Sequence, residues 1–152
     1  MKRPLTGVLV GGCAAGALDI VYAMILTGQR ARPPLRAVQS VASGLLGKAA
    51  YDMGAASVLL GFACHFTIAL GAAFVYFGAS RRLALLRERP LVAGSLFGMC
   101  VFLFMHFVVV PLSAAPFTMG HTPTVFAQGF LSHAVLIGIP IAAALRRFEG
   151  AR

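Results

Sequence analysis

The sequence predicts an all-α membrane protein in which four transmembrane helices form a bundle, with one short amphipathic helix at the membrane interface. Two observations predict this fold class. Of the 152 residues, 59% are hydrophobic and only 11% are charged, and the mean hydropathy is +0.88, whereas soluble domains carry charge on about a quarter of their residues. The apolar residues also collect in four long runs with short basic connections. This pattern indicates a single transmembrane domain over residues 1–152.

The longest uncharged run, residues 54–79, contains no Asp, Glu, Lys or Arg. A helix of this length extends about 39 Å, which is enough to cross a hydrocarbon core of about 30 Å with some tilt. Three further runs are also long enough to cross a membrane. The predicted spans are residues 7–26, 54–79, 91–112 and 124–145.

Glycines spaced four residues apart occur in two of these spans. The pairs are Gly7 with Gly11, Gly12 with Gly16, and Gly94 with Gly98. Small residues at this spacing let another helix approach closely, so we expect packed faces there, either within the bundle or between chains. The basic N-terminus before an apolar run also resembles a secretory signal. We expect no cleavage, because the run before a cleavage-like site at residues 10–13 is too short.

Residues 35–50 are too short and too polar to form a span. Apolar residues recur at helical spacing, namely Leu35, Val38, Ala42, Leu45, Leu46 and Ala49. The polar residues Arg36, Gln39, Ser40 and Ser43 occupy much of the other side. We expect an amphipathic helix in the membrane interface, and a connector packed over the bundle is the open alternative.

Two prolines are expected to shape the last two spans. Pro111 lies at the far end of the third span, where it can stop the helix. Pro140 lies inside the fourth span and should kink it near the membrane edge.

Lys and Arg are distributed unevenly between the two sides that four spans define. Nine of the 13 belong to the two termini and to the connection after the second span, which share one side. The other side holds Arg30, Arg32, Arg36 and Lys48. Because cytoplasmic segments carry the excess of Lys and Arg, we expect both termini to be cytoplasmic. Anionic lipid headgroups would account for the basic residues on the opposite side.

The composition also limits the partners of the chain. The net charge of +9 does not indicate nucleic-acid binding, because the basic residues lie in short clusters between apolar runs. The expected partner is the lipid bilayer, together with a second copy of the chain or a larger membrane complex. The three cysteines lie inside predicted spans without a CxxC motif, so we expect them to behave as small apolar residues.

Each predicted span carries one ionisable side chain well inside it. The four are Asp19, His65, His106 and His133. Their calculated depths differ by only about 5 Å, close to one helical turn. An Asp at a helix centre costs at least about 2.5 kcal/mol in a bilayer, so such groups normally face the bundle interior and find a polar partner. We therefore expect one connected site in which Asp19 faces a histidine.

Several interpretations of this set remain open. A purely structural layer would hold the helices in register through hydrogen bonds, whereas Asp and His chains are also the usual parts of proton- or ion-linked sites. His65, His106 and His133 could instead bind a transition metal or a b-type haem, although no second motif supports a cofactor. The chain has no GxSxG or HExxH motif, so we do not expect an enzyme.

Three stretches resemble the YagU-like family of small bacterial inner-membrane proteins. They are His65-Phe66-Thr67 with the run to Tyr76, Ala93-Gly94-Ser95-Leu96 through Met105-His106 to Pro111-Leu112, and Ser132-His133 leading to Arg146-Arg147. The resemblance implies an inner-membrane location. It also implies that the histidines at positions 65, 106 and 133 form a shared set. It implies no reaction and does not extend to the first span, so the inclusion of Asp19 rests on its predicted depth alone.

Overall fold

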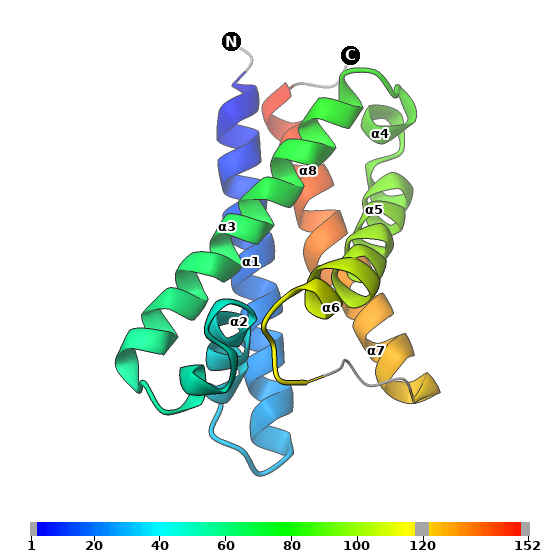
Figure 1. The fold of residues 1–152 in the computed structure, drawn as a ribbon. Helices are drawn as coiled ribbons and strands as arrows, with labels where there is room; N and C mark the ends of the chain where they lie inside the picture. Colours follow the sequence, from blue (N-terminus) through cyan, green and yellow to red (C-terminus); the bar gives the residue numbers. More distant parts are fainter. Residues whose placement is uncertain (1–2, 118–121, 150–152) are drawn as a thin grey trace.

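The computed structural model describes residues 3–117 and 122–149, and within them the protein is helical with no strand (Figure 1). Two of the basic residues counted in predicting the orientation, Lys2 and Arg152, lie outside the described residues. Four helical rods are long and apolar enough to cross a membrane. They are α1 (Pro4–Gln29), α3 (Ala55–Ser80), the series α5 (Pro90–Phe104), η2 (Met105–Val109) and α6 (Val110–Leu112), and the series α7 (Pro123–His133), η3 (Ala134–Gly138) and α8 (Ile139–Glu149). The predicted fold class is confirmed, and the rods agree with the predicted spans to within about one turn.

The rods run up and down, so both chain ends lie at the same end of the molecule (Figure 1). We call this the terminal end, and it also holds α4 (Leu85–Glu88) in the connection between α3 and α5. The backbone N–H of Arg3 donates to the carbonyl of Phe148 across 3.1 Å and joins the two termini. The opposite end, where α1 leads toward α3, is the loop end.

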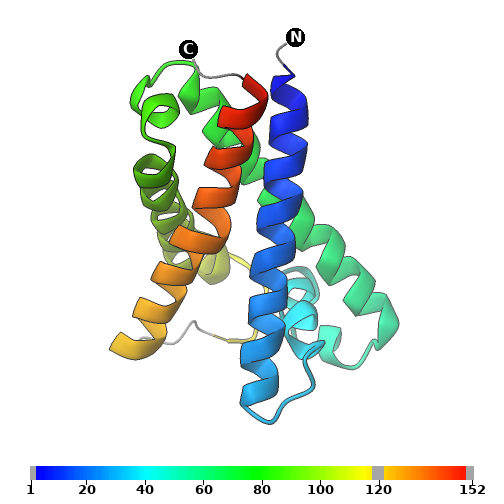
Figure 2. The same ribbon diagram turned by 180° about the vertical axis from the view of Figure 1, so that it is seen from behind.

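Helix α1 lies between α3 and α8 (Figure 2). Gly7 and Gly11 pack against α8, whereas Gly12 and Gly16 pack against α3. A Cβ at Gly11 would lie 3.0 Å from Cα of Ile141 in α8, whereas a Cβ at Gly12 would lie 2.8 Å from the Leu70 side chain in α3. The pairs point in different directions around the helix axis because Gly7 and Gly12 are five residues apart, about 140° of rotation. Within this chain, therefore, both glycine faces of the first span are used for packing inside the bundle.

The glycines of the third span pack against the fourth rod. A Cβ at Gly94 would lie 2.7 Å from the carbonyl oxygen of Gly138, and one at Gly98 would lie 2.1 Å from that of His133. Backbones can approach this closely only where side chains are missing. The outer surface of the rods is apolar as well, with exposed side chains that include Leu59, Leu91 and Leu112. The four candidate spans thus place lipid-facing surface around a core in which small residues pack against larger ones such as Tyr76, Ile141 and Leu145.

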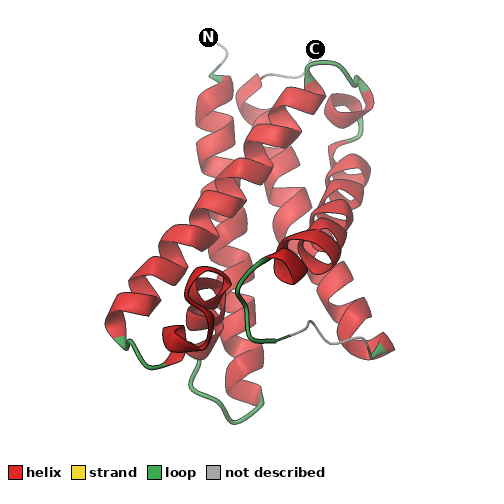
Figure 3. Ribbon diagram, viewed as in Figure 1, coloured by secondary structure: helices red, strands yellow, loops and turns green. Residues whose placement is uncertain are grey.

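The shorter helix α2 (Arg36–Leu46) and the 3₁₀ segment η1 (Gly47–Tyr51) connect α1 to α3. Helix α3 diverges from α1 toward the loop end, and α2 packs against α3 there (Figures 1 and 2). The loop after α6 runs beside α2, where the N–H of Ala114 donates to the carbonyl of Gly44 across 2.9 Å (Figure 3). A Cβ at Gly61 of α3 would clash with the backbone of Val38. The element is therefore a helix packed tightly over the bundle.

The predicted apolar face of residues 35–50 is only partly correct. Val38 and Ala42 are fully buried, but Leu35 and Leu45 are exposed. Two polar residues assigned to the outer side, Gln39 and Ser43, are buried instead. Gln39 donates from Nε2 to Oγ of Ser57 in α3 across 3.1 Å, and a buried amide needs such a partner. This contact turns the polar residues toward α3.

Two rods contain a π-helical turn, and each turn ends two residues before a proline. Segment η2 precedes Pro111, and segment η3 precedes Pro140. A proline inside a helix has no N–H to donate, and its ring clashes with the carbonyl four residues earlier. A wider turn relieves that clash. A π-helical turn thus precedes Pro140, where a kink is predicted, and the third rod ends at Leu112, one residue after Pro111.

Candidate functional site

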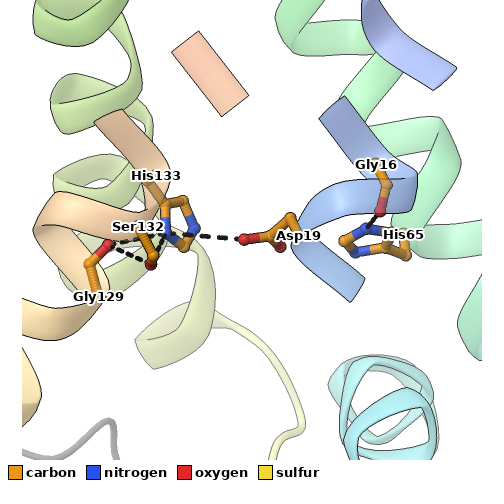
Figure 4. Close-up of polar contacts among 6 residues, drawn as sticks. All are labelled: Gly16, Asp19, His65, Gly129, Ser132 and His133. Atoms are coloured by element: carbon orange, nitrogen blue, oxygen red, sulfur yellow. Dashed lines mark hydrogen bonds and ion pairs between the residues drawn. The ribbon is translucent and has the colours of Figure 1, made fainter. Parts of the chain in front are cut away.

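The Asp19 carboxylate of α1 faces the His133 imidazole of α7. Oδ1 of Asp19 lies 4.0 Å from Nδ1 of His133, which is ion-pair distance when the imidazole is protonated (Figure 4). Both side chains are largely buried, at 16% and 20% exposure. Nδ1 of His133 donates to the carbonyl of Gly129 across 2.9 Å. Because a carbonyl can only accept, this bond places a proton on Nδ1, and in the neutral ring Nε2 is then the acceptor.

The pair is one step in an antiparallel register between α1 and the fourth rod. Gly7 lies against Leu145, and Gly11 lies against Ile141. Steps of four residues lead from Gly11 to Asp19 on α1, and likewise from Ile141 to His133 on the fourth rod. Asp19 and His133 face each other at the end of these two rows. Residues at this spacing line one helix face. The packing of small against large side chains near the terminal end therefore determines that Asp19 faces His133.

A cavity of about 200 Å³ lies beside the pair, between α1, α7 and the third rod. Its polar lining includes Asp19, Tyr22, His106, Gln128, Ser132 and His133. The cavity extends along α1 from Asp19 to Arg30 at the loop end, a distance of about 16 Å at about 1.5 Å per residue. The ionisable groups are thus placed beside a mostly apolar cavity with several polar side chains, and this cavity extends toward the loop end.

His106 lines the same cavity from the π-helical segment η2, and it is 4% exposed. The ring of Phe102 is close to both histidines, with ring centroids 5.4 Å from His106 and 5.3 Å from His133. Phe126 packs edge-on against His106 at 5.4 Å. Aromatic rings therefore hold the two imidazoles within one apolar wall of the cavity.

His65 lies on the other side of α1 (Figure 4). Its Nε2 donates to the carbonyl of Gly16 across 2.8 Å, which joins α3 to α1 without reaching the cavity. The structure therefore brings Asp19, His106 and His133 to one cavity and leaves His65 outside it. In the described parts of the chain, no three His, Cys, Asp or Glu side chains are placed to hold a metal ion together.

Three polar cavity residues were not among the candidate site residues predicted from the sequence: Tyr22, Gln128 and Ser132. Ser132 donates from Oγ to the carbonyl of Gly129, the same group that accepts from His133. Gln128 lies five residues before His133 on the same helix. It is a polar residue inside an apolar span, and this is the sequence signal that would have identified it.

Comparison with protein-family models, with curated proteins and with solved structures gives no match. The functional conclusion therefore rests on the residues and geometry of this chain alone.

Proposed function

We propose that Asp19 and His133 form a proton-accepting pair, and that the protein is a proton-linked membrane transporter or a subunit of one. The observation that carries this proposal is the carboxylate–imidazole pair beside a cavity inside a four-span membrane protein. Imidazole changes its charge near neutral pH, and intramembrane Asp and His residues are the usual parts of proton relays.

The surroundings of the pair support a role in proton exchange as well as in packing. A purely structural polar layer needs only hydrogen bonds between helices, as His65 makes with Gly16. Asp19 and His133 instead line a space that extends toward the loop end. Water in such a space can deliver a proton to an imidazole nitrogen and remove it again.

The experiment is proton flux into liposomes that contain the purified protein and an internal pH-sensitive dye, driven by a potassium diffusion potential. The variants Asp19→Asn and His133→Gln should reduce the flux about tenfold or more, the change produced by losing about 1.4 kcal/mol of interaction. The matched control is His65→Asn, which removes an imidazole at similar depth outside the cavity and should leave the flux unchanged.

Two results would contradict the proposal. One is a wild-type flux no higher than that of empty liposomes. The other is a folded Asp19→Asn protein with wild-type flux, since the pair would then serve packing alone.

The proposed location is a bacterial inner membrane with both termini in the cytoplasm. The distribution of Lys and Arg supports this orientation, because nine of the 13 belong in sequence to the two termini and the connection after the second span. The proposed membership of the YagU-like family supports the same membrane. In this orientation the cavity of Asp19 and His133 extends toward the periplasm.

A further inference from the structure

A second and larger cavity lies at the loop end, where α1, the turn after it, α2 and the segment after α6 meet. Its volume is about 760 Å³, within the usual range for small-molecule sites. Its polar lining includes Arg30, Arg32, Arg36, Ser40 and Tyr51. We call it the basic cavity. It adjoins the cavity of Asp19 and His133, because Arg30 and Val125 line both.

The acidic residues that the structure describes lie where they do not pair with the three arginines of the basic cavity. The chain contains only four acidic residues in all. Asp19 faces His133, while Glu88 and Glu149 belong to elements at the terminal end. Within the described residues, none of the three arginines forms an ion pair with Asp52, the remaining acid. In the described parts of the sequence these arginines therefore have no ion-pair partner within the chain.

The backbone that carries the arginines is held by hydrogen bonds. The N–H of Arg32 donates to the carbonyl of Thr27 across 3.2 Å, and that of Arg36 donates to the carbonyl of Pro33 across 2.9 Å. The guanidinium carbon of Arg36 also lies 4.8 Å from the centroid of the Tyr51 ring. Such a cation–π contact orients the planar guanidinium group. The turn thus fixes the backbone that carries the arginines, and the ring orients the guanidinium group of Arg36 before any ligand binds.

We propose that the basic cavity binds a phosphate group. Guanidinium groups form paired hydrogen bonds with phosphate oxygens, and the hydroxyl of Tyr51 adds an uncharged donor to the lining. The phosphate can belong to an anionic phospholipid or to a soluble ligand. The basic cavity lies just past the last residues of α1, at the level where a membrane places its headgroups. This assignment does not depend on proton exchange at Asp19 and His133.

The experiment measures binding of dioctanoyl phosphatidylglycerol to the purified full-length protein by native mass spectrometry. Dioctanoyl phosphatidylcholine and inorganic phosphate serve as further probes, the second as a competitor. The variants Arg32→Gln and Arg36→Gln each remove one charge from the basic cavity. The matched control Arg82→Gln removes one exposed charge at the terminal end.

Each cavity variant should weaken binding about tenfold or more, as loss of one charge-assisted contact does, while Arg82→Gln should bind as the wild type does. Selective binding of phosphatidylglycerol without competition by phosphate identifies a lipid headgroup as the ligand. If inorganic phosphate competes with phosphatidylglycerol, and both cavity variants but not Arg82→Gln weaken its binding, the ligand is a soluble phosphate. Equal weakening in all three variants, or binding of neither anion, overturns the proposal, because net charge alone would then account for the data.

Discussion

The backbone of Gly98 in α5 lies directly against the backbone of His133. A Cβ at Gly98 would be 2.1 Å from the carbonyl oxygen of His133, a distance that a real side chain does not adopt. The contact fixes the height of the histidine relative to α5. Phe102 and His106 follow Gly98 on the same helix face at intervals of four residues. The glycine therefore sets the relative positions of the two histidines that line the cavity.

The variant Gly98→Ala should lower the free energy of unfolding by about 1–3 kcal/mol, because the added methyl group forces α5 and the fourth rod apart. The control is Gly71→Ala, where a Cβ would have no neighbour within 4 Å. Unfolding of both variants in mixed micelles, followed by circular dichroism, measures the difference. Equal stability of the two variants would contradict the close packing.

The variant Pro140→Ala should convert the π-helical turn η3 toward a regular helix, because it restores a backbone N–H and removes the ring clash. His133 would then rotate relative to Ile137, which lies in the packed row facing α1. We expect proton flux to fall while thermal stability is kept. Backbone chemical shifts of residues 134–138, measured by solid-state NMR, report the helix type directly.

The matched control for that change is Pro123→Ala, since Pro123 occupies the first turn of α7, where a proline costs little. It should alter neither the shifts of residues 134–138 nor the flux. If Pro140→Ala leaves those shifts unchanged, the proline is not the cause of the π turn.

The buried bond between Gln39 and Ser57 should show strong coupling in a double-mutant cycle. Ser57→Ala leaves the amide of Gln39 without this partner inside the protein, so we expect a loss of about 1–3 kcal/mol. Combining it with Gln39→Leu should recover part of that loss, because two apolar groups need no partner. Strictly additive effects would show that the bond does not hold α2 on α3.

The proposed orientation predicts the activity of reporter fusions. Alkaline phosphatase, which is active only in the periplasm, should be inactive when fused after Arg152 and active when inserted after Phe117. The reason is the excess of Lys and Arg at the terminal end. The opposite pattern of activities would reverse the orientation and place the basic cavity in the cytoplasm.

The positions of the spans could be predicted because long uncharged runs leave few alternatives in a chain this apolar. Helix α1 extends from Pro4 to Gln29, beyond the predicted residues 7–26, since polar residues continue the helix past its apolar stretch. The predicted similar depth of Asp19 and His65 agrees with the bond from His65 to the carbonyl of Gly16, less than one turn from Asp19.

Rotation of the helices could not be predicted from depth. His65 continues the face of Gly61, which packs against α2, so it points away from the cavity. Asp19 continues the face of Gly7 and Gly11, which packs against the fourth rod. The direction of each glycine row thus indicates where the next polar residue points, but only after its neighbouring helix is known. The π turns and the buried polar face of α2 likewise depend on contacts between segments distant in sequence.

The two π turns change which residues share a helix face. A π turn contains one more residue than the α turn it replaces, so the residues after it are rotated by about 100° around the helix axis relative to a regular α-helix. His106 lies inside one such turn and His133 directly precedes the other. The turn in the fourth rod is also packed against α5, because Gly138 lies against Gly94. Each turn therefore resets the helix face between a cavity histidine and the proline that follows it.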